Sequence, residues 1–184
     1  MRRFENNAAQ VASEFAAYAG LLMRENVKSY LEIGSQYGAS LWSAAKVLPK
    51  GSRLVSVDMP QNAATSGSLG ECVTELNKLG FDAHLYLADS TIGHIIDQVS
   101  DWGPFDCVFI DGNHTLPGVT QDWRNYGPMA RMVAFHDIVW DRPVRPGRLP
   151  IEVSHLWREL KKKYRHEEFI APGSEKGIGV LWRE

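Results

Sequence analysis

The sequence predicts an α/β fold, a doubly wound sheet that is mostly parallel and carries an antiparallel last strand. Short apolar or β-branched runs alternate with longer segments of helical periodicity along the chain. The run Cys107–Ile110 is continuously apolar, which is typical of a parallel strand covered by helices on both faces. The last two apolar runs are joined by a segment too short for a parallel crossover, so they must form an antiparallel hairpin.

The N-terminal segment predicts an amphipathic helix that ends near Asn26 and packs on or covers the sheet. Small and apolar residues recur at helical spacing between Ala8 and Leu22. Glu14 and Arg24 interrupt this stretch, which excludes a signal sequence and a membrane span. The helix could also pair with a second copy of the chain to form a homodimer.

The remaining elements alternate in the order expected of βαβ units. Pro49–Gly51 is a turn between the first helix of the alternation and the second strand. The predicted strands are residues 28–33, 54–57, 83–87, 107–110, 131–135, 168–170 and 178–182. The predicted helices between them are residues 39–47, 71–79, 91–99, 119–126 and 151–164.

Length and composition restrict the classes of protein to consider. A chain of 184 residues predicts a single domain, residues 1–184. The 20 basic and 22 acidic residues give a net charge of -2 without a long basic run, so nucleic acid is not an expected partner. Two cysteines imply no disulfide framework, and with no membrane segment the expected location is the cytoplasm.

The turn after the first strand is the expected ligand-binding point. Open parallel sheets bind ligands beyond the carboxyl ends of their strands, where the strand order reverses. Gly34 and Gly38 allow a sharp turn and a close backbone approach just before a helix. Gln36 stands where a dinucleotide fingerprint would have its second glycine, which argues against a pyrophosphate site.

Acidic residues follow the next two strands. Asp58 ends the second strand, where a carboxylate can accept both hydroxyl protons of a ribose. Asp89 and Ser90 end the third strand, near enough in this topology to approach an adenine ring.

This glycine-containing turn (Glu32–Gly38), the acidic residues after it and the reversed last strand together resemble the class I S-adenosylmethionine-dependent methyltransferases. The resemblance covers residues 27–184 and implies a Rossmann-like sheet of strand order 3-2-1-4-5-7-6. It also implies that Glu32 and Gly34 face the methionine part of the cofactor, Asp58 the ribose and Asp89 the adenine amino group. The expected cofactor-binding set is Glu32, Gly34, Ser35, Gly38, Asp58, Asp89 and Ser90.

Two further carboxylates are expected at the same edge of the sheet. Asp111 follows the fourth strand and Asp137 follows the fifth, so neighbouring strands about 4.8 Å apart would bring them side by side. Two such carboxylates repel unless a cation lies between them, and a divalent metal such as Mg or Mn would supply that charge. A metal would also help to deprotonate a hydroxyl nucleophile.

His114 is the candidate general base. It lies three residues after Asp111, behind a Gly-Asn pair that predicts a loop, and its usual pKa is close to neutral. The segment Asp111–His114 resembles the small metal-dependent O-methyltransferases of the catechol, caffeoyl-coenzyme A and macrolide-sugar type. That resemblance implies Asp111 and His114 as catalytic residues and Asp111 and Asp137 as metal ligands.

His136 departs from the pattern of that branch. Those enzymes usually place a further Glu, Asp or Asn beside the second metal carboxylate, where this chain has His136. Magnesium favours oxygen ligands, so His136 either completes a site for manganese, iron or zinc or points away and is hydrogen-bonded in the sheet edge. Joint ligation by His136 and Asp137 requires that the backbone bends where the strand ends.

The favoured function is methyl transfer from S-adenosylmethionine to a hydroxyl of a small-molecule acceptor, assisted by a metal and His114. A nicotinamide-dependent oxidoreductase is the first alternative, but the missing middle glycine and the lack of a Tyr-x-x-x-Lys pair count against it. A non-catalytic S-adenosylmethionine-binding module is the second alternative.

Overall fold

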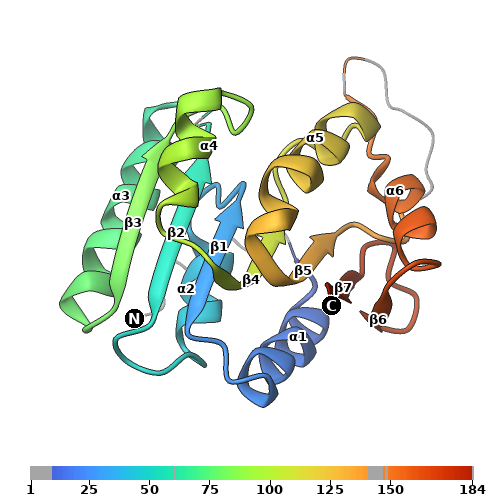
Figure 1. The fold of residues 1–184 in the computed structure, drawn as a ribbon, viewed down its shortest axis with the longest axis horizontal. Coiled ribbons are helices and arrows are strands. Elements are labelled where there is room, and N and C mark those ends of the chain that lie inside the picture. The colour runs from blue at the N-terminus through green and yellow to red at the C-terminus, as the bar shows by residue number, and fades with distance from the viewer. Residues whose placement is uncertain (1–9, 60, 141–146, 148, 184) are drawn as a thin grey trace.

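The computed structural model describes residues 10–59, 61–140, 147 and 149–183, and its centre is a seven-stranded sheet (Figure 1). The strand order is β3-β2-β1-β4-β5-β7-β6, with β1 to β5 parallel and β7 antiparallel to both β5 and β6. The predicted α/β class, strand order and reversed terminal hairpin are therefore confirmed. The strands are β1 Ser29–Ile33, β2 Arg53–Asp58, β3 Asp82–Leu87, β4 Phe105–Ile110, β5 Ala130–His136, β6 Arg165–Phe169 and β7 Ile178–Trp182.

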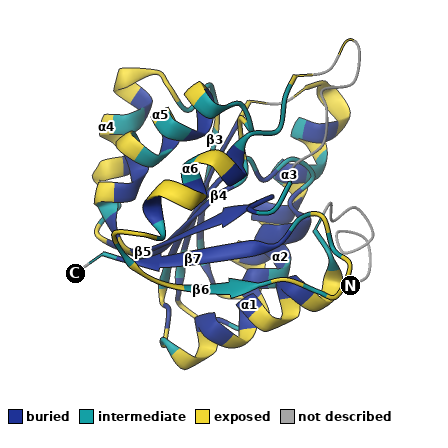
Figure 2. Ribbon diagram, turned by 90° about the vertical axis from the view of Figure 1, so that its right-hand side faces the viewer, coloured by how far each residue is buried: buried dark blue, intermediate teal, exposed yellow. Residues whose placement is uncertain are grey.

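Helices cover both faces of the sheet. Side chains of α1, α2 and α3 pack on one face, and those of α4, α5 and α6 pack on the other. In β4, Cys107 and Phe109 face the first layer while Val108 and Ile110 face the second, so both faces of the strand are covered by helices (Figure 2). The helices are α1 Ala12–Arg24, α2 Ala39–Ala45, α3 Ala63–Lys78, α4 Gly93–Ser100, α5 Leu116–Tyr126, the short 3-10 helix η2 Gly127–Met129 and α6 Val153–Leu160.

Helix α1 packs on the sheet, and residues 1–9 of the predicted N-terminal segment lie outside the described part of the chain. Phe15 and Tyr18 pack against Phe109 of the central strand. The buried Glu14 carboxylate accepts hydrogen bonds from two backbone N–H groups, those of Ala171 at 2.9 Å and Gly177 at 3.1 Å. This charged residue therefore holds the β6–β7 connection. No helix in the described part of the chain is long and apolar enough to cross a membrane.

Several boundaries differ from the sequence-based expectation by three or more residues; helix α6, for example, ends at Leu160 rather than at residue 164. Helix α3 begins at Ala63 rather than near residue 71, because Asn62 and Thr65 form a capping box that starts the helix ahead of a glycine- and serine-rich stretch. Strand β6 begins at Arg165 rather than at residue 168. Its first residues are polar because β6 is the edge strand and pairs only with β7.

The register of the sheet brings the candidate residues to one edge. Ile33 pairs with Val57 on one side and with Ile110 on the other, and Ile110 pairs with Phe135. Because these strands are parallel, the residues that follow them emerge together at their carboxyl ends.

Candidate active site

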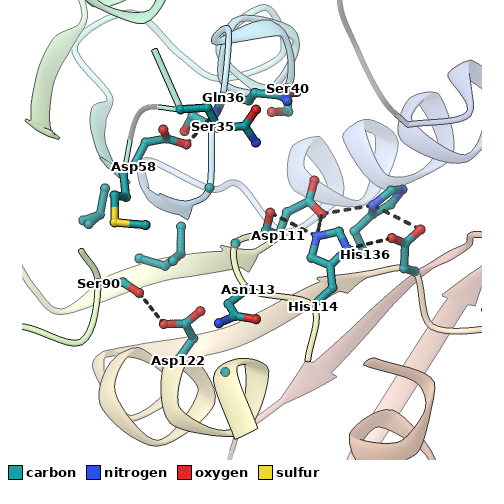
Figure 3. Close-up of a pocket in the computed structure, with 18 of the residues that line it drawn as sticks. Ser35, Gln36, Ser40, Asp58, Ser90, Asp111, Asn113, His114, Asp122 and His136 are labelled. Carbon is teal, nitrogen blue, oxygen red and sulfur yellow. Dashed lines mark hydrogen bonds and ion pairs between the residues drawn. The ribbon is translucent and has the colours of Figure 1, made fainter. Parts of the chain in front are cut away.

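A cavity of about 1000 Å³ opens at this edge of the sheet. Two groups of loops line it (Figure 3). We call the residues at the carboxyl ends of β1, β2 and β3 and in the loops that follow, which are Gly34–Gln36, Asp58 and Asp89–Ser90, the β1–β3 side. We call the residues at the carboxyl ends of β4 and β5 and in the loops that follow, which are Asp111–His114 and His136–Asp137, the β4–β5 side. The sequence assigned these two groups to cofactor and acceptor, and the structure places them in one pocket.

The turn after β1 requires glycine because the chain passes close to the loop after β4. Gly34 has φ +91°, and a Cβ there would clash with the Asp111 carbonyl oxygen and lie 2.6 Å from Gly112 Cα. Gly38, with φ +86°, precedes α2, and a Cβ would lie 2.8 Å from Cys72 Cβ. The predicted close approach is therefore made here to the protein's own backbone and to the helix α3.

Gln36 has a strained backbone conformation, and its N–H connects the turn after β1 to the end of β2. Its φ is +50°, in the left-handed region that favours glycine, and its N–H donates a 2.7 Å hydrogen bond to the Asp58 carboxylate. Burial raises the pKa of Asp58, and the bond from Gln36 partly opposes that rise. Asp58 lines the cavity where the sequence predicts a ribose site.

Glu32 lies beneath the pocket and does not line it. Its fully buried carboxylate accepts hydrogen bonds from Ser40 Oγ at 2.6 Å and Tyr30 OH at 3.2 Å. Burial raises the pKa of Glu32 to about 7. The expected direct contact with the methionine part of a cofactor is thus not supported. Glu32 instead positions Ser40, which lines the cavity beside Ser35.

The loop after β3 holds both predicted residues at the cavity wall. One oxygen of Asp89 accepts bonds from the N–H and hydroxyl of Thr91, each 2.8 Å long. Ser90 Oγ donates a 2.7 Å bond to Asp122 on α5. Sequence analysis missed Asp122, which is buried and also lines the cavity. Its only signal was an acidic residue on the apolar stripe of a helix, three residues after Val119.

The β4–β5 side is a network of two carboxylates and two imidazoles. The His114 ring lies between the carboxylates, with Nε2 3.1 Å from Asp111 and Nδ1 3.0 Å from Asp137. His136 Nδ1 lies 3.0 Å from the same Asp111 oxygen. Asp137 has φ +60°, so the backbone bends directly after β5 and lets consecutive residues reach one site, as the sequence analysis required.

Attraction between the carboxylates and the imidazoles determines which groups of this network carry protons. Burial alone would raise the pKa of Asp111, but the two imidazoles outweigh it and hold that pKa far below its ordinary range. Burial alone would lower the pKa of His114, but hydrogen bonds to Asp111 and Asp137 raise it to about 10. The pKa of His136 is raised by the same carboxylates against the effect of burial. At neutral pH, His114 therefore carries a proton between two carboxylates.

Gln10 also reaches this network. Its side-chain amide donates a 2.6 Å hydrogen bond to the second oxygen of Asp111, across 101 positions of sequence. Gln10 lines the cavity just before α1. No local sequence pattern marks it, because only the tertiary fold brings this segment over β4.

The predicted metal set is brought together but does not fit an ion as placed. Both oxygens of Asp111 are engaged, one by the two imidazoles and the other by Gln10. In the described residues, no group of three or more His, Cys, Asp or Glu side chains is arranged to hold a metal. Imidazolium charge supplies the attraction between carboxylates that the sequence analysis assigned to a metal. The metal at Asp111, Asp137 and His136 stays a prediction.

Comparison with known proteins identifies the family of this fold and pocket. A family model described as a methyltransferase domain matches residues 31–138, more than half of the 184-residue chain. The chain belongs to this methyltransferase family. The match includes the turn after β1 and ends just after Asp137, so it spans both sides of the pocket. The family disfavours the nicotinamide-dependent alternative.

Solved structures share the fold of this methyltransferase at low sequence identity. The O-methyltransferase TomG of Streptomyces achromogenes, in complex with SAM, is 18% identical with a TM-score of 0.67, covering 96% of this chain and 82% of TomG. An O-methyltransferase of Bacillus cereus in complex with SAH is 16% identical with a TM-score of 0.68, covering 97% and 85%. A Klebsiella pneumoniae protein assigned as an O-methyltransferase is 18% identical with a TM-score of 0.71, covering 98% and 87%. No curated protein matched the sequence.

Proposed function

We propose that this methyltransferase transfers a methyl group from S-adenosylmethionine to a hydroxyl group of a small molecule. The observation that carries the proposal is one continuous cavity. The turn after β1 lines one side of it, and the carboxylate–imidazole network of the β4–β5 side lines the other. Its volume of about 1000 Å³ lies at the upper end of the range of small-molecule sites, which allows a cofactor and a small acceptor together. The SAM and SAH complexes of TomG and the Bacillus cereus enzyme support the choice of donor.

The β1–β3 side suits the donor. Asp58 would accept the ribose hydroxyls, with its orientation fixed by the Gln36 N–H. The Asp89–Ser90 loop would border the adenine ring, and Ser35 and Ser40 would border the methionine part. Glu32 supports this surface from below through Ser40.

The β4–β5 side suits the acceptor. In the reaction, an oxygen–methyl bond forms, the sulfur–methyl bond breaks, and the products are a methyl ether and S-adenosylhomocysteine. The acceptor hydroxyl must lose its proton, and His114 is the proposed recipient. Because its raised pKa keeps His114 protonated at neutral pH, it can act as a base only after it releases that proton. Activity that depends on His114 should therefore rise as the pH is increased toward about 10.

A divalent metal would lower the cost of deprotonating the acceptor hydroxyl. Asp111, Asp137 and His136 would hold it only if His114 and Gln10 moved away from Asp111. Calorimetric titration of the chelator-treated protein with Mn²⁺ tests this directly. Binding that is lost in Asp137→Asn would establish the metal site, whereas no heat together with full activity in chelator would exclude it.

The test of the proposed function is methyl transfer itself. The purified protein is incubated with S-adenosylmethionine and a panel of small phenols, catechols and sugars, and products are followed by mass spectrometry. We expect one acceptor to gain a single methyl group, in amounts matched by S-adenosylhomocysteine. Binding of S-adenosylmethionine without transfer to any hydroxyl compound would favour a non-catalytic binding module instead.

A further inference from the structure

Helix α5 carries a buried carboxylate that holds the loop after β3. Asp122 is 1% exposed, and one of its oxygens accepts the 2.7 Å hydrogen bond from Ser90 Oγ. One turn further along the helix, the Tyr126 hydroxyl donates a 2.7 Å bond to the Ser90 carbonyl oxygen. Both the hydroxyl and the carbonyl of Ser90 are therefore fixed by α5, which sets the position of this part of the cavity wall.

The same helix also holds the loop after β4. Thr115 caps α5, and the Asn113 side chain accepts bonds from the Thr115 N–H at 3.1 Å and hydroxyl at 2.8 Å. Gly118 has no side chain because a Cβ there would lie 2.6 Å from Asn113 Cβ. The second oxygen of Asp122 faces this loop, only 3.4 Å from the position that a Cβ on Gly112 would take.

We infer that Asp122 is a positioning residue that couples the cofactor loop at Ser90 to the catalytic loop at Asp111–His114. The inference rests on the proposed function. One carboxylate lies between the two loops, and Figure 3 shows it between Ser90 and Asn113. A cofactor that orders Ser90 thereby orders Asp122 and, through it, the loop that carries the network of the β4–β5 side.

The cost of burying the charge of Asp122 distinguishes a functional role for this residue from a purely structural one. Burial, with a smaller contribution from the charge of Asp89, raises the pKa of Asp122 to about 6, although the hydrogen bond from Ser90 partly opposes that rise, so its ionised form is less favourable in the fold than in water. Its second oxygen is buried, and the backbone N–H of Asn113, in the loop after β4, helps to stabilise the carboxylate by lowering its pKa. A neutral amide at this position avoids the cost of burying a charge. A residue needed only for stability would therefore be no worse as asparagine.

The first experiment compares the unmodified protein with Asp122→Asn by calorimetric titration with S-adenosylhomocysteine and by thermal unfolding. We expect about tenfold weaker binding, because the hydrogen bond from Ser90 loses its charge assistance, with a Tm that is unchanged or higher. Ser90→Ala should weaken binding similarly, and the double variant should be no weaker than either single one. Glu14→Gln is the control, a buried carboxylate outside the cavity that should lower the Tm and leave binding unchanged.

The second experiment measures the coupling without an acceptor. Imidazole NMR signals of His114, assigned with a His114→Gln variant, should shift when S-adenosylhomocysteine is added to the unmodified protein. In Asp122→Asn saturated with the same compound, the shift should be reduced by at least half. Rescue of the shift in Asp122→Glu would further support the role of the carboxylate.

The outcomes distinguish this inference from the proposed function. If the unmodified protein gives no heat with S-adenosylhomocysteine, the proposed function is wrong and the coupling is overturned with it. If the unmodified protein binds but Asp122→Asn binds equally well and shows the same His114 shift, the coupling alone is overturned. Weaker binding accompanied by a lower Tm in proportion would also overturn it, because Asp122 would then be structural.

Discussion

The two sides of the pocket are built in different ways. The β1–β3 side depends on backbone conformation, with positive φ at Gly34 and Gln36 and with the carboxylates of Asp58 and Asp89 each held by a backbone N–H. The β4–β5 side depends on charge, with His114 held between two buried carboxylates. The first arrangement suits recognition of a fixed cofactor shape, and the second suits movement of a proton. Substitutions should therefore separate cofactor affinity from catalytic rate.

The largest effect is expected at Gly34, where the two sides touch. Gly34→Ala should destabilise the fold by at least ~3 kcal/mol and abolish S-adenosylhomocysteine binding, because its Cβ would clash with the backbone of Asp111 and Gly112. Gly51→Ala is the matched control, since Gly51 also has positive φ but faces open space. Chemical denaturation measures both, and equal losses in the two variants would show that the contact between the two sides is unimportant.

A substitution on the β4–β5 side should lower the rate of methyl transfer and leave the cofactor affinity nearly unchanged. His114→Gln should slow methyl transfer by about 10²- to 10⁴-fold, the usual contribution of a general base, with S-adenosylhomocysteine affinity changed by less than about threefold. Steady-state kinetics and calorimetry measure the two quantities. His155→Gln, at an exposed position outside the cavity, serves as the control. A loss of affinity equal to the loss of rate would contradict the division between the two sides.

A substitution on the β1–β3 side should lower the affinity for the cofactor. Asp58→Asn should weaken S-adenosylhomocysteine binding about 10- to 100-fold, because charge-assisted hydrogen bonds to the ribose are lost, while kcat at saturating cofactor changes little. The exposed Asp101→Asn should have no effect. A large fall in kcat with unchanged affinity would place Asp58 in the chemistry instead.

The smallest effect is a pH dependence of stability. His114 has a higher pKa in the fold than its ordinary value of 6.5, so its protonated form stabilises the fold. That stabilisation is complete below about pH 6.5 and is lost as the pH rises to about 10. Thermal unfolding across this range should show a steeper decline for the unmodified protein than for His114→Gln. Parallel curves would mean that the network does not hold the proton.

Sequence reasoning predicted the sheet and several of the charged and polar residues that line the pocket, because both depend on local signals. Apolar runs mark the strands. Asp58 ends one of them, and Asp111 and Asp137 stand immediately after two others. Parallel pairing then requires that they meet. The start of α3 was misplaced because its first turns contain weak helix formers, and only the capping box at Asn62 compensates for them.

The parts that sequence reasoning could not supply depend on tertiary contacts. Gln10 reaches Asp111 only because α1 packs against β4. Glu32 was expected at the pocket surface, but its side chain lies beneath the pocket and accepts a hydrogen bond from Ser40. The carboxylate pair was predicted from neighbouring strands, and a metal was expected to relieve its repulsion. The imidazoles that relieve it were identifiable only from the distances between side chains.

A crystal structure with S-adenosylhomocysteine bound tests the central claim most directly. The account predicts the ribose on Asp58, the adenine beside Ser90 and the sulfur directed across the cavity toward Asp111 and His114. A cofactor bound outside this cavity, or within it with its sulfur directed away from His114, would contradict the account.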